Sequence, residues 1–75
     1  MREGYIVWNE STVENEFFGV YKSWERAFRQ FRKVVKNRYG RCPRNYDDVL
    51  DYLNEVEGLG TESIKITKFV ENDAS

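Results

Sequence analysis

Apolar and aromatic residues follow two different spacings along this 75-residue chain. Segments 4–9 (GYIVWN) and 16–21 (EFFGVY) are almost continuously apolar, and in segment 63–71 (SIKITKFVE) apolar and polar residues alternate. Short runs rich in β-branched and aromatic residues are typical of strands. Because only the polar segment 10–15 separates the first two runs, we expect them to form an antiparallel hairpin.

Two segments between the hairpin and the last strand have the spacing of amphipathic helices. Ser23 and Asn45 are suitable N-caps, because their side chains accept hydrogen bonds from the free amides of a first helical turn. Gly40 is expected to end the first helix and Gly58 the second. The apolar positions are Trp24, Ala27, Phe28, Phe31, Val34 and Val35 in the first helix, and Tyr46, Val49, Leu50, Leu53 and Val56 in the second.

The predicted order is therefore ββααβ, which indicates an α+β fold. The simplest packing is a three-stranded antiparallel sheet with both helices on one face. We expect the last strand to lie beside the first, because the two helices return the chain to the sheet. Residues 1–71 are predicted to form a single domain, and residues 72–75 a frayed tail.

The predicted strands carry more apolar residues than one covered face requires. Side chains alternate across a strand, so helices on one side can cover only one set. We assign one set to the core: Ile6, Trp8, Phe18, Val20, Ile64 and Ile66. The other face is then expected to expose Tyr5, Val7, Phe17, Tyr21 and Phe69.

An exposed aromatic face of this kind is larger than most monomers show, and it is typical of an interface. It could join two copies of the chain, since two-fold dimers are the commonest oligomers. It could also bind a different protein, or stack unpaired nucleic-acid bases. A fourth interpretation is that long side chains such as Lys65 and Lys68 cover part of it.

Charge is distributed unevenly, although the formal net charge is −1. Residues 1–21 carry one basic and four acidic side chains, residues 22–44 nine basic and one acidic, and residues 45–75 two basic and eight acidic. At about 100° per residue, five bases of the first helix fall within a roughly 120° arc opposite its apolar stripe. They are Arg26, Arg29, Arg32, Lys33 and Lys36. Asp47, Asp48, Asp51 and Glu55 form an acidic face on the second helix.

The basic face has three interpretations. It could neutralise nucleic-acid phosphates or an acidic protein, it could pair with the acidic helix next to it, or it could simply be solvated. Specific reading of bases would need further polar groups. Gln30 and Asn37 are available, but they lie off the centre of the arc.

Common catalytic chemistry is missing from the sequence. There is no His, which is the usual general base near neutral pH and the commonest metal ligand. Cys42 is the only cysteine, and without a histidine partner we expect an incidental thiol in a reducing cytoplasm. We predict no enzyme activity, metal, cofactor or small-molecule substrate. No apolar run is long enough for a membrane span, and no secretory signal is recognised.

The stretch FFGVYKSWERAF resembles small uncharacterised bacterial and bacteriophage proteins. In those proteins a strand ends in Gly-Val-Tyr or Gly-Val-Phe, and a Ser then caps a helix with Glu in its first turn and Ala soon after. The matching positions here are Gly19, Val20, Tyr21, Ser23, Glu25 and Ala27. The resemblance covers the hairpin and the start of the first helix. It implies that the chain is a small accessory protein that binds host factors. It does not indicate a particular activity.

Taken together, these patterns predict a small protein-interaction module that pairs with itself or with another protein through its sheet. The alternative is a nucleic-acid-binding protein that uses the basic face of its first helix.

Overall fold

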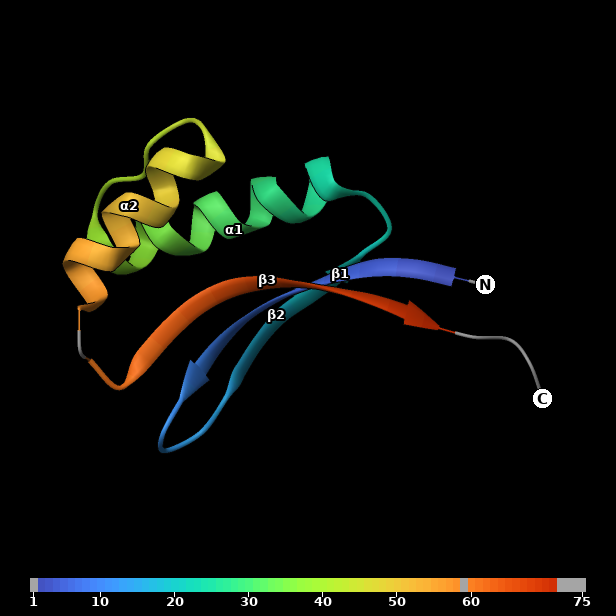
Figure 1. The fold of residues 1–75 in the computed structure, drawn as a ribbon, viewed down its shortest axis with the longest axis horizontal. Coiled ribbons are helices and arrows are strands. Elements are labelled where there is room, and N and C mark those ends of the chain that lie inside the picture. Colours follow the sequence, from blue (N-terminus) through green and yellow to red (C-terminus); the bar gives the residue numbers. More distant parts are fainter. Residues whose placement is uncertain (1, 59, 72–75) are drawn as a thin grey trace.

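The protein is a three-stranded antiparallel sheet with both helices on the same side of it (Figure 1). A computed structural model describes residues 2–58 and 60–71, and the tail expected at 72–75 lies outside the described residues. The order ββααβ and the α+β class are confirmed. The elements are β1 (Arg2–Ser11), β2 (Glu16–Tyr21), α1 (Trp24–Tyr39), α2 (Tyr46–Glu57) and β3 (Glu62–Glu71).

The sheet has the order β2-β1-β3, so the last strand lies beside the first as predicted. β1 is longer than segment 4–9 because it pairs with β3 along its whole length, from Arg2 opposite Glu71 to Ser11 opposite Glu62. The pairing of β1 with β2 is interrupted once, where Val7 faces Gly19 and Trp8 faces Phe17. One residue of β2 is therefore left without a partner, which defines a β-bulge.

Both helices begin and end where the capping residues predict. The Ser23 side chain accepts a hydrogen bond from the Arg26 amide at 3.3 Å, and the Asn45 side chain accepts one from the Asp48 amide at 2.9 Å. Gly40 has the left-handed backbone (φ 85°) that commonly ends a helix, and its amide donates to the Lys36 carbonyl. These local contacts fix the two ends of α1 and the start of α2.

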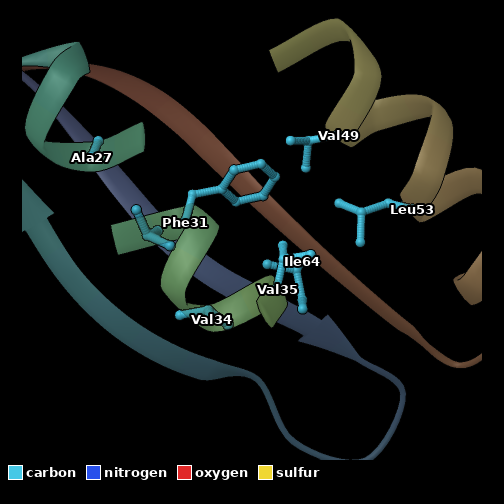
Figure 2. Close-up of a cluster of buried hydrophobic side chains, with 8 residues drawn as sticks. Ala27, Phe31, Val34, Val35, Val49, Leu53 and Ile64 are labelled. Atoms are coloured by element: carbon cyan, nitrogen blue, oxygen red, sulfur yellow. The ribbon is translucent and has the colours of Figure 1, made fainter. Parts of the chain in front are cut away.

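The hydrophobic core lies between the helices and one face of the sheet (Figure 2). α1 lies over all three strands, whereas α2 packs against β3. Aromatic rings extend the core toward the start of α1. There the rings of Tyr46 and Trp24 meet edge to face, with 4.9 Å between their centroids. The buried apolar residues are Val7, Ala27, Phe31, Val34, Val35, Val49, Leu53 and Ile64.

The sequence-based assignment of β1 to its two faces is wrong. Val7 is completely buried, and Tyr5 packs against the core with it. Ile6 and Trp8 therefore point to the side without helices, because neighbouring side chains alternate. The pattern of segment 4–9 could not decide between the two sets, since both are apolar. Ile64 and Ile66 were placed correctly, and both contribute to the core.

In β2 the assignment is partly wrong, and the bulge is the reason. Phe18 packs against the core and Phe17 is 68% exposed, as predicted. After the bulge, however, Tyr21 packs against the core and Val20 is 64% exposed, the reverse of the prediction. An extra residue in a strand shifts the alternation that follows it, so strict period-two counting fails here.

Candidate functional site

The side of the sheet opposite the helices carries an apolar centre, which we call the uncovered sheet face. No helix of the described chain lies over it (Figure 1). Of the five residues predicted for an exposed face, Phe17 and Phe69 are on this side, and Tyr5, Val7 and Tyr21 are not. Trp8, Ile6 and Val20 take their place. The uncovered sheet face therefore consists of Ile6, Trp8, Phe17, Val20 and Phe69.

Trp8, on the central strand β1, lies at the hairpin end of the uncovered sheet face. Its ring stacks on Phe17, with 5.8 Å between centroids and an angle of 11° between the planes. The indole N–H donates to the Thr67 hydroxyl at 2.8 Å, and the Lys65 ammonium lies 5.3 Å from the ring centroid. These contacts hold a broad aromatic surface in one orientation, and such ordered surfaces are typical of binding hot spots.

At the other end of this face the surface is hollowed. A Cβ on Gly4 would overlap the Phe69 ring, so the ring lies directly over the glycine. A shallow hollow of about 570 Å³ opens beside it and is also lined by Val20, Arg2 and Glu71. The face thus has a stacked aromatic pair at the hairpin end and a hollow where β1 begins and β3 ends.

Charges of both signs surround the apolar centre of the uncovered sheet face. Lys65 and Glu10 form an ion pair at 2.9 Å at the hairpin end. Arg2 and Glu71 lie opposite each other on neighbouring strands at the other end, and Lys22 borders the hollow. An apolar centre inside a polar rim is the usual anatomy of a protein interface.

The second candidate is the basic face of α1. Four of its five predicted members, Arg26, Arg29, Lys33 and Lys36, are exposed. Arg32 is half-buried and donates from Nε to the Pro43 carbonyl at 3.1 Å, so it anchors the loop between the helices. Among residues 2–58 and 60–71 no ion pair joins α1 to α2. The basic face of α1 is therefore not neutralised by ion pairs with the acidic face of α2.

Part of the basic face borders a groove. Between the end of β2 and α1 the surface has a shallow, open depression of about 450 Å³, which we call the basic groove. It is lined by Tyr21, Arg26, Arg29, Gln30 and Lys33. Three cations line it, and no acidic residue does. Tyr21 lies here because its ring extends over Gly19 and its hydroxyl donates to the Phe18 carbonyl at 3.3 Å.

A polar network joins four elements at the hairpin end of the molecule. Arg38 forms ion pairs with Glu62 at 2.8 Å and Glu16 at 3.2 Å, and these carboxylates, Glu16 first, raise the pKa of its guanidinium. Glu57 accepts from the Tyr39 hydroxyl at 3.1 Å and from the Ile64 amide at 3.0 Å. Burial and the nearby Glu57 raise the pKa of Tyr39 to about 12. The network holds α1, α2, β2 and β3 together, and nothing in it requires a ligand.

Comparison with known proteins gives no relative: no protein-family model, curated protein or solved structure matches the chain. Across the described ranges, no three His, Cys, Asp or Glu side chains are arranged to hold a metal ion. Nor does that part of the chain contain a helix that is long and apolar enough to cross a membrane. The candidate surfaces must therefore be interpreted from their own geometry.

Several residues of the two candidate surfaces have no local signal in the sequence, because their positions depend on pairing between distant segments. The contacts of Thr67 and Lys65 with Trp8 follow from the register of β1 and β3, which no local pattern encodes. Tyr21 enters the basic groove only because the bulge turns it to the helix side. Gln30 lies off the centre of the basic arc, and this position brings it into the groove.

Proposed function

We propose that this chain is a small non-enzymatic interaction module that binds a second copy of itself through the uncovered sheet face. The observation that carries the proposal is the exposure of an ordered apolar surface on the side of the sheet that neither α1 nor α2, the helices of the described chain, covers. Phe17 and Val20 are 68% and 64% exposed there, next to the fixed ring of Trp8. Burying such a surface removes apolar area from water, which is the main driving force of association.

The charge around the uncovered sheet face is compatible with a second copy of the chain. The rim of the uncovered sheet face combines Arg2, Lys22 and Lys65 with Glu10 and Glu71, so two copies meet without strong like-charge repulsion. The basic face of α1 cannot self-associate in this way, because it would place cations opposite cations. The sheet side is therefore the favoured contact between copies.

The shape of the uncovered sheet face also fits a second copy of the chain. In a two-fold dimer the same patch is used by both copies, so each contact occurs twice. If the strands of the two copies run antiparallel, the Trp8–Phe17 pair of each copy lies over the hollow beside Gly4 of its partner. An aromatic pair and a hollow at opposite ends of one face suit such an arrangement.

The expected dimer is weak. Three strands about 4.8 Å apart and ten residues of about 3.3 Å each give a projected area of at most roughly 480 Å². A standard interface covers about 800 Å² per partner. We therefore expect a dissociation constant in the micromolar to millimolar range.

The proposal includes the type of protein: a small accessory protein of a bacterium, phage or mobile element, as the FFGVYKSWERAF stretch suggests. A reducing cytoplasm fits its single cysteine, Cys42. A different protein that uses the same face would compete with the dimer.

The test is sedimentation velocity over a wide range of protein concentration. We expect the mass of the wild-type chain to rise from one to two copies between about 10 μM and 1 mM, as a weak interface requires. Val20→Lys, at the hollow of the uncovered sheet face, should keep the chain monomeric over this range. Val70→Lys is the matched control, because Val70 is a similarly exposed valine (54%) on the helix side of the same sheet.

Tryptophan fluorescence locates the contact. In Trp24→Phe the remaining indole is Trp8, whose emission should shift to shorter wavelength as the dimer forms. A chain that stays monomeric at 1 mM, or that loses its dimer equally in Val70→Lys, would rule out self-association through this face.

A further inference from the structure

We propose that the basic groove between α1 and β2 binds the sugar-phosphate backbone of single-stranded nucleic acid. This site lies on the helix side of the sheet, and of its described lining residues only Tyr21 also borders the hollow beside Gly4. Its lining combines three cations, one amide and one aromatic ring: Arg26, Arg29, Lys33, Gln30 and Tyr21. Grooves that bind single strands use the same combination of cations and stacking rings.

The cations of the groove have no acidic partners within the described chain. Arg38, on the same helix, pairs with Glu16 and Glu62, whereas no ion pair involves Arg26, Arg29 or Lys33 among residues 2–58 and 60–71. The chain contains 13 acidic residues, so acids are not scarce. Unpaired cations that line a hollow give it a positive potential despite the net charge of −1.

The spacing of the cations fits a short length of backbone. Arg26 and Lys33 are seven residues apart, which is about 10 Å along the helix axis. Stacked nucleotides advance about 3.4 Å each along one strand, so roughly three phosphates pass over this distance. Arg29, between the two, is placed to contact the middle one.

The concave shape and the aromatic ring favour a single strand over a duplex. Tyr21 is half-buried at the β2 side of the groove. A ring in that position can stack only on a base that is not paired within a duplex. Gln30, also half-buried, provides an amide donor and acceptor that can bond to a base edge.

The proposed dimer leaves this groove open. The uncovered sheet face and α1 are on opposite sides of the sheet (Figure 1). A dimer would therefore carry two grooves that face outward, and binding and dimerisation can be measured separately.

The experiment measures fluorescence anisotropy of labelled 12-nucleotide single strands, dT12 and rU12, with the full chain at 20 mM and 150 mM salt. We expect binding at 20 mM salt that weakens steeply with salt. Arg29→Gln with Lys33→Gln should weaken binding at least tenfold and lower the slope of log K against log salt by about 1.4, which is 0.7 per lost phosphate contact. Arg44→Gln with Lys68→Gln is the matched control, because it removes one Arg and one Lys outside the groove.

A second pair of variants tests whether the Tyr21 ring stacks on a base. Tyr21→Leu should weaken binding by about tenfold, and Tyr21→Phe, which keeps the stacking surface, should restore it. Circular dichroism shows whether each variant is folded. The proposal is overturned if no strand binds at 20 mM salt, or if both double variants lose binding equally. It is also overturned if a 12-base-pair duplex or poly-glutamate binds as tightly as the single strands.

Discussion

At the scale of single residues, the most unusual position is Asn9. Its side chain is completely buried in β1, and neither its oxygen nor its nitrogen has a hydrogen-bond partner among the described residues. An unpaired buried amide costs about 1–3 kcal/mol.

Replacing Asn9 should therefore stabilise the protein. We expect Asn9→Val to raise the free energy of unfolding by about 1 kcal/mol, because it removes the unpaired polar atoms and retains a β-branched residue in a strand. Urea unfolding followed by circular dichroism measures the change. Asn9→Asp is the opposite control and should be strongly destabilising. A loss of stability in Asn9→Val would show that the amide is satisfied after all.

At the scale of elements, the helices were predictable and the strand faces were not. Caps at Ser23 and Asn45 and a clear helical period set α1 and α2 at the predicted places. The ends of the strands depend on partners far along the chain, so β1 is longer than its local pattern indicates. In β2 the bulge reverses the predicted facing after Phe18.

Substituting Gly19, at the bulge, should destabilise the protein more than substituting Gly40, at the end of α1. Both have positive φ, 145° and 85°, which is costly for a residue with a Cβ. A Cβ on Gly40 would meet no atom within 4 Å, whereas a Cβ on Gly19 would lie 2.8 Å from the ring of Tyr21. We expect Gly40→Ala to cost about 1 kcal/mol and Gly19→Ala about 2–3 kcal/mol in unfolding free energy.

Thermal and urea unfolding of the two glycine variants provide the comparison. Equal losses would mean that only the backbone angle matters at Gly19, and that Tyr21 moves aside freely. In that case the ring would not be fixed at the edge of the basic groove.

At the scale of the whole molecule, the Arg38–Tyr39–Glu57 network ties both helices to the sheet. Glu57 is an acid in the last turn of α2, where the helix dipole disfavours it. Glu57 accepts hydrogen bonds from the Tyr39 hydroxyl and the Ile64 amide, and these two bonds offset that cost. The second bond also satisfies one backbone amide of the edge strand β3. Covering an edge strand in this way limits unwanted pairing.

Stability should consequently depend on pH through Tyr39. Its pKa rises from 10.0 to about 12 in the fold, so the folded protein holds this proton more tightly than the unfolded chain. The contribution is complete below about pH 10 and is lost as pH rises through 12. Urea unfolding of wild type and Tyr39→Phe should differ by about 1 kcal/mol at pH 9, and the difference should shrink toward pH 12.

Absorbance at 295 nm provides a separate check on the same group. The wild-type protein should contain a phenol that ionises near pH 12, and this transition should be missing from Tyr39→Phe. A difference in stability that does not change between pH 9 and pH 12 would contradict the assigned role of the proton.

The amino-acid sequence by itself determined the elements, their order and the position of the basic face on α1. These features depend on contacts within a few residues: caps, periodicity and the 100° step of a helix. Only the tertiary structure decided which side of the sheet is covered, that Tyr21 borders a groove and that Arg38 rather than Arg29 is paired. Those outcomes depend on strand register, one bulge and packing between distant segments, and both faces of β1 are apolar enough to have served as the core.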